Sequence, residues 1–344
     1  GVRDPNTGAP WQADTLVLVF SLTKGISALT LALAHSRGWL DYDAPVARYW
    51  PGFARNGKAD ITVRQLLAHQ AGLHAFHRKV DRAAIADLDR MARILEAETP
   101  AWPPGERNAY HFLSLGFYEN ELMRRVDPRG RSIAQVFRDE IAVPLGLDFH
   151  ISLPADVPND RLAPLSMAGP LATIFGFPPR MALALLTPWS QAFRACVVNP
   201  GAQVLFDPET IYARGLEVPS GGGVGTARAI AGAYGAFATG GAALGIAPRT
   251  MAELKAPARL PSRGFFDEVV KGEAQYALGF MKPFAGFSFG HPEAFGAPGA
   301  GGSLGFADPE TGVGYGYVTN RIGTGVAPDP RDIALRAALA TVVG

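Results

Sequence analysis

A serine and a lysine stand three residues apart at the start of an apolar segment, in the run Ser21-Leu22-Thr23-Lys24. On a helix, residues i and i+3 share a face, so the Ser21 hydroxyl and the Lys24 amine would lie side by side in the first turn. A serine hydroxyl is a weak nucleophile until a base takes its proton. Lysine can be that base if burial and the positive end of the helix lower its pKa. The alternative is an N-cap serine and a solvated lysine, because S-x-x-K occurs often by chance.

The surroundings of this motif resemble those of penicillin-recognising enzymes, in which S-x-x-K supplies the nucleophile. The matching parts occur in the expected order along essentially the whole chain. They are the segments 14–51 and 61–73, the stretch Pro104-Gly105-Glu106 before Tyr110, and the run 299–306. On these motifs the chain resembles the class C β-lactamase-like serine hydrolases, and within them the family VIII carboxylesterases.

The resemblance implies a role for each matching position. Ser21 would form the acyl-enzyme, and Lys24 and Tyr110 would share the proton transfers, with Tyr110 as a phenolate stabilised by Lys24. The backbone N–H groups of Ser21 and Ala300 would form the oxyanion hole. The residues expected to contact the substrate are Gly299, Gly301 and His111.

Two departures from the family pattern bear on the substrate. The tyrosine motif often runs Tyr-x-Asn, but here it is Tyr110-His111-Phe112, and the position of the lysine in K-T-G is held by Ala297. Without that cation nothing clamps a substrate carboxylate, which favours neutral esters over penicillin-like acids. The sequence therefore predicts hydrolysis of small carboxylic esters.

Other functions stay open at this point. A β-lactamase, a D-Ala-D-Ala peptidase or an acyltransferase would use the same three residues. A catalytically silent scaffold is the alternative outside enzymes. The presence of Ser21, Lys24 and Tyr110 together argues against it.

The run Gly301-Gly302-Ser303-Leu304-Gly305 fits G-x-S-x-G, the nucleophile elbow of α/β-hydrolases. That motif needs a histidine downstream, but the last histidine in the chain is His291. Ser303 is therefore not expected to be a nucleophile, and His291 is expected to be structural.

Two further patterns have a structural interpretation. The glycine-rich stretch 220–226 lacks the lysine of a phosphate-binding P-loop, so it reads as a turn into a helix capped by Thr226. His69, His74 and His77 have no accompanying carboxylate pattern, so neither a metal site nor a cofactor is expected.

The elements that must position these residues follow from periodicity. Leu22, Ile26, Leu29 and Leu33 form one helical stripe that Gly38 ends. Capping boxes at Thr62 and Ser132 open two further helices, the second ending before Pro144. Apolar spacing predicts helices at 85–95, 115–126, 180–186, 227 onwards and 329–343. Strands are expected at 303–307 and 312–320, joined by a turn at 308–312; in the second, Val313, Tyr315 and Tyr317 face away from Gly314 and Gly316.

This order, together with the resemblance, predicts an α+β fold of the serine β-lactamase/penicillin-binding-protein type. An antiparallel sheet flanked by helices would be built from both chain ends, residues 1–65 and 215–344. A mostly helical domain, 66–214, would be inserted between them, with the site in the cleft. Apolar residues in 174–193 would form either an acyl pocket or ordinary core.

Composition limits the classes of protein to which this chain can belong. The chain has 344 residues, 48% of them hydrophobic, and a formal net charge of +1, so a large core is expected and a nucleic-acid partner is not. Cys196 is the only cysteine, which excludes an internal disulfide. No apolar run approaches the roughly 20 residues that span a bilayer. These features predict a cytoplasmic protein acting on a small molecule, with its oligomeric state undetermined.

Overall fold

The computed structural model describes residues 1–166, 169, 176–198, 200–207, 209–323 and 329–343. In this part of the chain the largest sheet has five antiparallel strands in the order β12-β11-β10-β9-β8. Both strands expected from the sequence belong to it, next to each other. The five strands are β8 (Tyr276–Ala277), β9 (Phe280–Met281), β10 (Phe295–Pro298), β11 (Leu304–Asp308) and β12 (Val313–Tyr317).

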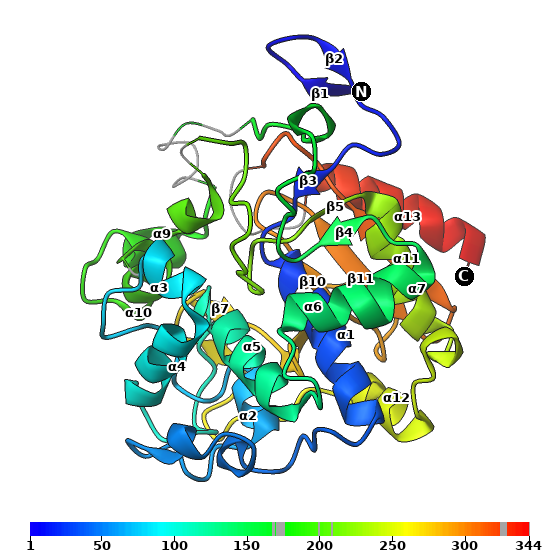
Figure 1. Ribbon diagram of the computed structural model, residues 1–344. Coiled ribbons are helices and arrows are strands. Elements are labelled where there is room, and N and C mark those ends of the chain that lie inside the picture. The colour runs from blue at the N-terminus through cyan, green and yellow to red at the C-terminus, as the bar shows by residue number, and fades with distance from the viewer. Residues whose placement is uncertain (167–168, 170–175, 199, 208, 324–328, 344) are drawn as a thin grey trace.

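Helices cover both faces of this sheet (Figure 1). The alternation of glycine and tyrosine along β12 decides which helix lies on which face. A Cβ atom on Gly314 would lie 2.2 Å from the backbone nitrogen of Gly235, so α11 (Ala227–Ala238) packs directly on the glycine face. On the other face the Tyr315 hydroxyl donates to Asp332 of α13 (Pro330–Val343) at 2.8 Å. The predicted alternation of tyrosine and glycine is thus confirmed.

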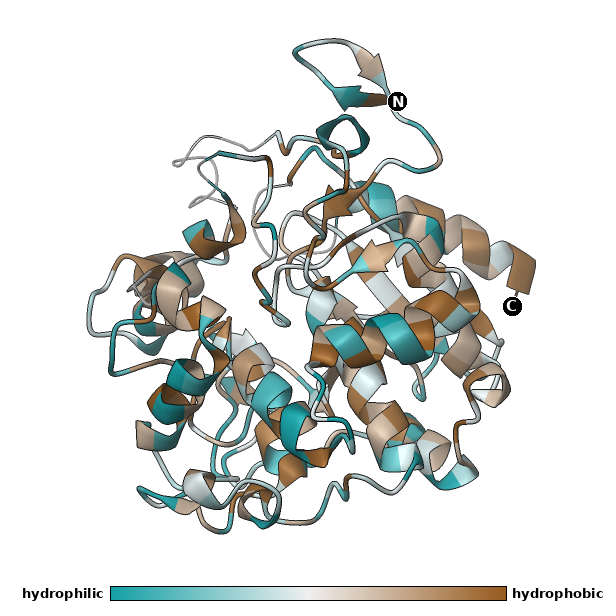
Figure 2. Cartoon of the chain, viewed as in Figure 1, coloured by the Kyte–Doolittle hydropathy of each residue, from teal (hydrophilic) through white to brown (hydrophobic). Residues whose placement is uncertain are grey.

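Helix α1 (Leu22–Ser36) lies beside α11 against β9, β10 and β11. Every residue from Leu22 to Ala34 is buried, and hydrophobic residues run along this helix in Figure 2. The expected stop at Gly38 is confirmed, since Gly38 has a φ of +73° just after the helix. Because α1 is enclosed on all sides, any polar side chain in its first turn is forced into the interior.

The middle of the chain is helical, and both capping boxes are present at Thr62 and Ser132. The predicted helix at 85–95 is wrong in one respect: it is two helices, broken at Asp87, whose carboxylate caps the second by accepting from the Arg90 N–H at 2.9 Å. Between α1 and residue 130 the α-helices are α2 (Val63–Leu67), α3 (Arg82–Ala86), α4 (Leu88–Ala97) and α5 (Ser114–Val126).

The sequence predicted that the helix after Ser132 ends before Pro144, but the helical segment continues past this proline. A π-helical turn, Arg138–Ala142, connects it to a short helix in which Pro144 occupies the first turn. Proline is tolerated there because first-turn N–H groups need no intrahelical acceptor. The other α-helices in the described part of the chain are α6 (Ile133–Phe137), α7 (Val143–Leu145), α9 (Pro179–Leu185), α10 (Gln191–Phe193) and α12 (Pro248–Lys255).

Among the described residues, the N-terminal part of the chain contributes no strand to the five-stranded sheet, and the two chain ends pair instead in a smaller sheet, where β3 lies next to β5. The N-terminal strands pair with each other in a hairpin that projects from the body at the top of Figure 1. A separate three-stranded sheet, in the order β3-β5-β4, leads into α1. The smaller strands are β1 (Val2–Asp4), β2 (Ala9–Pro10), β3 (Val17–Leu18), β4 (Phe149–His150), β5 (Val224–Gly225), β6 (Phe266–Asp267) and β7 (Gly272–Glu273).

One apolar cluster runs through both predicted domains. It joins Leu16 and Leu29 near the N-terminus to Leu122 in the helical part and to Phe237 and Phe295 around the sheet. The boundaries at 66 and 214 stay a prediction, and the main core is continuous across them.

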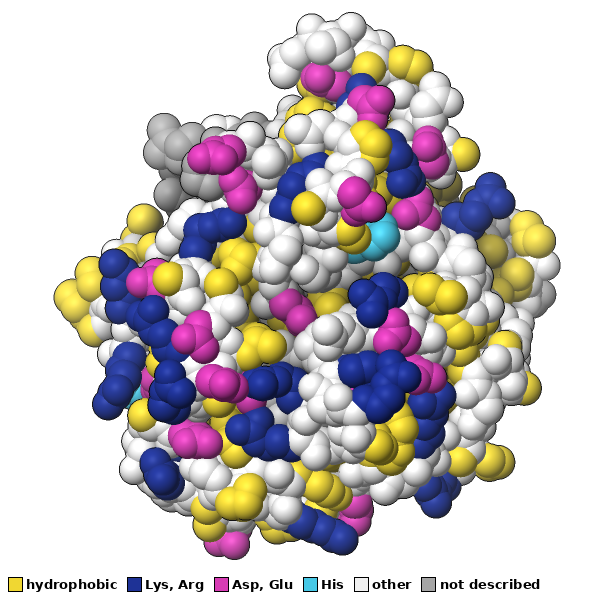
Figure 3. All heavy atoms as spheres, in the orientation of Figure 1, with side chains coloured by type: hydrophobic (Ala, Val, Ile, Leu, Met, Phe, Trp, Pro, Cys, Tyr) yellow, Lys and Arg dark blue, Asp and Glu magenta, His cyan; other side chains and the backbone are white. Residues whose placement is uncertain are grey.

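Acidic and basic side chains are interspersed on the face drawn in Figure 3, in keeping with the near-neutral net charge. Within the described residues, no helix is both long enough and apolar enough to cross a bilayer.

Candidate active site

Ser21 stands at a sharp turn between a buried strand and a buried helix. β3 ends at Leu18 and α1 begins at Leu22, so the chain passes from strand to helix within three residues. Phe20, directly before Ser21, has a φ of +48°, a left-handed conformation that costs free energy for an aromatic residue. The sequence gives no sign of this strain. With this backbone conformation, Ser21 stays partly exposed while the residues on either side of it are buried.

The amine of Lys24 has three polar partners. Nζ donates to the carbonyl oxygens of Phe112 at 2.7 Å and Ser220 at 2.8 Å, and lies 3.3 Å from Ser21 Oγ. Burial lowers the pKa of Lys24 to about 7, although the charges of Glu119 and Cys196 act in the opposite direction. A neutral amine has two hydrogens and one lone pair. With both hydrogens on the carbonyls, the lone pair is left for the Ser21 hydroxyl.

Tyr110 lies across from this pair. Its ring centroid is 4.7 Å from Lys24 Nζ, and its hydroxyl faces the Ser21 side chain. Burial raises the pKa of Tyr110 above its ordinary value of 10.0, and the contact with Ser21 only partly offsets this. The expected phenolate is therefore not the resting form at neutral pH, and the hydroxyl retains a proton that it can donate.

Two rings for which the sequence predicted no contact with Tyr110 pack against it, and a buried carboxyl lies behind them. Tyr276 stacks on it with ring centroids 5.9 Å apart, and His69 contacts it at 4.9 Å. The backbone N–H of Tyr110 and the Tyr276 hydroxyl both face the buried Asp267 carboxyl. Burial raises the pKa of Asp267 to about 6 despite these contacts. Tertiary packing alone brings β6 and β8 to the tyrosine motif, so no local pattern could have revealed them.

The turn after β10 lies against the segment that leads into Ser21. Ser303 Oγ donates to the Val19 carbonyl at 3.0 Å, and the Gly299 N–H donates to the Ser303 carbonyl at 2.7 Å. A Cβ atom on Gly299 would lie 2.1 Å from the Val19 oxygen, so only glycine fits. Ala300 follows this contact and is exposed. Ser303 is thus a buried hydrogen-bond donor followed by a strand, which confirms that the G-x-S-x-G run is not a nucleophile elbow.

His111 and Gly301 are placed away from the proposed substrate side. His111 is completely buried, and its backbone N–H donates to Nδ1 of His69 at 3.0 Å. Gly301 is buried against Ile322 and accepts from the Gly323 N–H at 3.0 Å. The structure therefore brings Ser21, Lys24 and Tyr110 together but gives His111 no surface for a ligand.

The remaining sequence candidates have structural partners. His74 bonds to Gln191 at 2.7 Å and His77 to Glu98 at 2.5 Å, so these two histidines and His69 have separate partners. His291 bonds to Asp308 at 2.8 Å beside the turn between β11 and β12. The glycine-rich stretch contributes a function that sequence reasoning missed, because the Ser220 carbonyl holds Lys24.

The apolar segment 174–193 is partly outside the described residues, since Ile174 is not among them. Ala184 of α9 and Ala192 just inside α10 form a small apolar cluster against which Tyr110 and Phe112 pack. These two alanines are therefore part of the core, and an acyl pocket in the segment stays a prediction.

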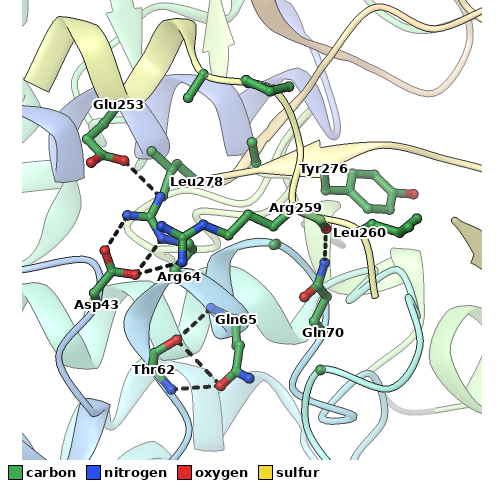
Figure 4. Close-up of a pocket in the computed structure, with 15 residues that line it drawn as sticks. Asp43, Thr62, Arg64, Gln65, Gln70, Glu253, Arg259, Leu260, Tyr276 and Leu278 are labelled. Carbon is green, nitrogen blue, oxygen red and sulfur yellow. Dashed lines mark hydrogen bonds and ion pairs between the residues drawn. The ribbon is translucent and has the colours of Figure 1, made fainter. Parts of the chain in front are cut away.

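A cavity of about 330 Å³ lies at a different place, between α2, α12 and β8. Figure 4 shows Arg64 held there between the carboxylates of Asp43 and Glu253. Tyr276 lines it, whereas Ser21, Lys24 and Tyr110 do not. Its charged groups pair with one another, so this cavity does not carry the candidate chemistry.

A serine beside a buried lysine one turn along the same helix, with a tyrosine opposite, defines a serine hydrolase of the β-lactamase type on this fold. The chain belongs to the Beta-lactamase family, whose profile matches residues 1–340.

Relatives with known names are esterases as well as lactamases. The chain is 36% identical over 333 residues to Esterase/beta-lactamase LipL of Mycobacterium tuberculosis, covering 94% of this chain and 73% of the relative. It is 28% identical over 375 residues to Esterase EstB of Burkholderia gladioli, covering 98% and 86%.

A crystal structure of a family VIII carboxylesterase superposes with a TM-score of 0.84 at 33% identity, covering 99% of this chain and 87% of that one. A penicillin-binding protein homologue from Caulobacter crescentus gives a TM-score of 0.81 at 35% identity, with the same coverage. The expected fold class and the resemblance to family VIII carboxylesterases are both confirmed.

Proposed function

We propose that this protein is a serine esterase that hydrolyses small neutral carboxylic esters through an acyl-Ser21 intermediate. The observation that carries the proposal is the Lys24 amine, which donates to two backbone carbonyls and lies 3.3 Å from Ser21 Oγ. With a pKa of about 7, a large fraction of this amine is neutral at physiological pH.

In the first half of the reaction Lys24 takes the Ser21 proton as Oγ attacks the ester carbonyl carbon. Backbone N–H groups of Ser21 and Ala300 would hold the negative charge on the carbonyl oxygen. Tyr110 donates its proton to the departing alkoxide and regains one from the Lys24 ammonium. In the second half water attacks the acyl group by the same transfers in reverse, which restores Ser21.

Two features support a neutral ester as substrate. Ala297, at the position of the family's lysine, is buried with its methyl group facing Gly25 of α1. Phe112 presents its carbonyl to Lys24 and packs its ring on Tyr110, where the family often has an asparagine side chain. The names of LipL, EstB and the family VIII carboxylesterase structure agree with ester hydrolysis.

The name of LipL also favours a second candidate activity, hydrolysis of β-lactams. We expect it to be slow here, since a lactam carboxylate would meet Ala297 instead of a lysine. The single cysteine, Cys196, supports a cytoplasmic location as a further part of the proposal.

Intact-protein mass spectrometry with p-nitrophenyl butyrate tests the nucleophile. Wild type should show a butyryl adduct or steady turnover, and Ser21→Ala should show neither. Ser303→Ala is the matched control and should still acylate. Equal behaviour of wild type and Ser21→Ala would overturn the assignment.

Substrate charge is tested with matched esters. p-Nitrophenyl butyrate should be hydrolysed with a kcat/KM at least about tenfold above that of mono-p-nitrophenyl succinate, which adds a carboxylate. A chromogenic cephalosporin should be slower still. Preference for the two anionic substrates would make lactam hydrolysis the main activity.

A further inference from the structure

The segment that holds α9 and α10 exposes three large apolar side chains to solvent. Leu183 is 69% exposed, Leu186 is 60% exposed and Trp189 is 82% exposed. They follow one another at intervals of three residues, so the two leucines share the outer face of α9 and its last turn. We call these three side chains the outer patch. Tryptophan is buried on average, and clustered exposed apolar side chains are typical of interaction sites.

Local hydrogen bonds hold Trp189 in its exposed position. The Ser190 N–H donates to the Thr187 carbonyl at 2.9 Å, which closes a turn with Pro188 and Trp189 at its two central positions. The Ser190 hydroxyl accepts from the Phe193 N–H at 3.0 Å and so caps α10. Proline favours the first central position of such a turn, so a defined backbone presents the indole ring to solvent.

The inner face of the same segment packs against the candidate active site. Ala184 of α9 and Ala192 of α10 are buried in the small cluster against which Tyr110 and Phe112 pack. Ala184 follows Leu183 directly in the chain but faces inward. This segment therefore separates the outer patch from Tyr110, and whatever covers the patch would lie close to the site.

Positive charge borders the outer patch. Residues 176–198 contain two arginines, Arg180 and Arg194, and no acidic residue. His74 bonds to Gln191 of α10 at 2.7 Å, so the exposed basic run 77–79 lies close by. Hydrophobic and basic side chains lie together at the left edge of Figure 3, where Figure 1 draws α3, α9 and α10. Exposed leucine and tryptophan with a basic border are typical of segments that bind at the surface of an anionic lipid bilayer.

We propose that the outer patch docks this protein on an anionic lipid surface. Leu183, Leu186 and Trp189 enter the headgroup region, and Arg180 and Arg194 contact the lipid phosphates. Three side chains bury too little apolar area to anchor the chain alone, so the affinity depends on the anionic charge as well, and docking is reversible. Docking does not require the proposed esterase function. If that function holds, the site acts on esters dissolved in the lipid surface.

Sedimentation with vesicles tests the docking. Ser21→Ala serves as the parent chain, so that no lipid ester is consumed. It should bind vesicles of phosphatidylcholine and phosphatidylglycerol in equal amounts at least about tenfold more tightly than vesicles of phosphatidylcholine alone. Adding Trp189→Ser should lower the partition coefficient on the anionic vesicles at least about tenfold, because the largest apolar side chain of the patch is lost. Arg180→Gln and raised salt should each lower it several-fold.

Val143→Ser is the matched control for this experiment. Val143 is 70% exposed on α7, which lies on the opposite side of the molecule from α9 in Figure 1. This variant should bind like the parent. Equal binding of Trp189→Ser and the parent, or no binding to anionic vesicles, would overturn the proposal. Self-association without lipid that depends on Trp189, in a chain that binds no vesicles, would make the patch a contact between copies of this chain.

Hydrolysis separates the docking from the proposed function. In the chain with Ser21 intact, Trp189→Ser should change kcat/KM for dissolved p-nitrophenyl butyrate by less than about threefold, and it should slow hydrolysis of a long-chain p-nitrophenyl ester in anionic vesicles at least about fivefold. Equal rates on the vesicle-bound ester would show that docking does not deliver substrate. If wild type hydrolyses neither ester, the esterase assignment fails, and sedimentation alone decides the docking.

Discussion

The Lys24 side chain is 2% exposed, and its pKa is near 7 because the interior hydrates an ammonium poorly. Its acceptors are backbone carbonyls from two distant segments, at Phe112 and Ser220. A carbonyl cannot be removed by substitution, so the amine keeps its orientation in any sequence that keeps this fold. At the scale of the residue, the chemistry depends on where one amine is buried.

Activity should follow the deprotonation of Lys24. The kcat/KM for a neutral ester should rise with pH through about 7 and then level, because the amine is the base only when neutral. Lys24→Arg stays protonated throughout and should lose at least about a thousandfold in kcat. A wild-type profile that is flat between pH 5 and 9 would contradict this base.

Lys24 should also lower stability, in a pH-dependent way. Its folded-state pKa is lowered to about 7 from 10.5, so the folded chain binds fewer protons than the unfolded chain between these values. The penalty is fully present below pH 7 and fades toward pH 10.5. In Tm measurements, the Lys24→Met difference from wild type should therefore shift in favour of wild type as pH rises through this window. A pH-independent difference would show that Lys24 is not perturbed.

Tyr110→Phe should acylate slowly, since the leaving alkoxide loses its proton donor. We expect a fall in kcat of about 10²–10⁴-fold on p-nitrophenyl butyrate. Tyr276→Phe is the control, because it keeps the stacked ring and removes only a hydroxyl that faces Asp267. Similar losses in both variants would mean that Tyr110 acts through packing.

The element that positions the base is α1, and the sheet fixes α1 together with α11. The close contact of α11 with β12 depends on two glycines, since a Cβ on Gly314 or Gly316 would meet α11 backbone atoms at 2.2 Å and 2.4 Å. Neighbouring side chains cannot relieve such a contact, so one element would have to shift.

Gly314→Ala should therefore destabilise the protein by about 2 kcal/mol or more. Gly272→Ala is the matched control in another strand, because a Cβ there would meet nothing within 4 Å and should change stability by less than about 0.5 kcal/mol. Urea unfolding of both variants measures the difference. Equal stabilities would show that α11 can move away from the sheet without cost.

In the molecule as a whole, one continuous core holds together the segments that supply the site. Ser21 and Lys24 come from the N-terminal part, the tyrosine motif from the middle and the Ser220 carbonyl from later in the chain. The apolar cluster that joins these parts runs from Leu16 to Ala307.

Unfolding should accordingly be one cooperative transition. Far-UV circular dichroism, tryptophan fluorescence and esterase activity should be lost together in urea, because the buried Trp50 shares the main core with α1. Activity lost well before the fluorescence of the core would indicate that the helical region 66–214 unfolds separately.

The sequence by itself determined the local parts of this protein. Helical periodicity located α1, the capping boxes located the starts of α2 and α6, and alternation in β12 assigned its two faces. Each depends on neighbours within a few residues. The S-x-x-K spacing placed Ser21 and Lys24 together for the same reason, and the resemblance to family VIII carboxylesterases added Tyr110 and the fold class.

Tertiary structure decided what local patterns do not encode. The burial that lowers the pKa of Lys24, the carbonyls that orient it, and the neutral state of Tyr110 all depend on segments far apart in sequence. Proton affinity depends on everything that surrounds a group, so only the assembled fold could set it.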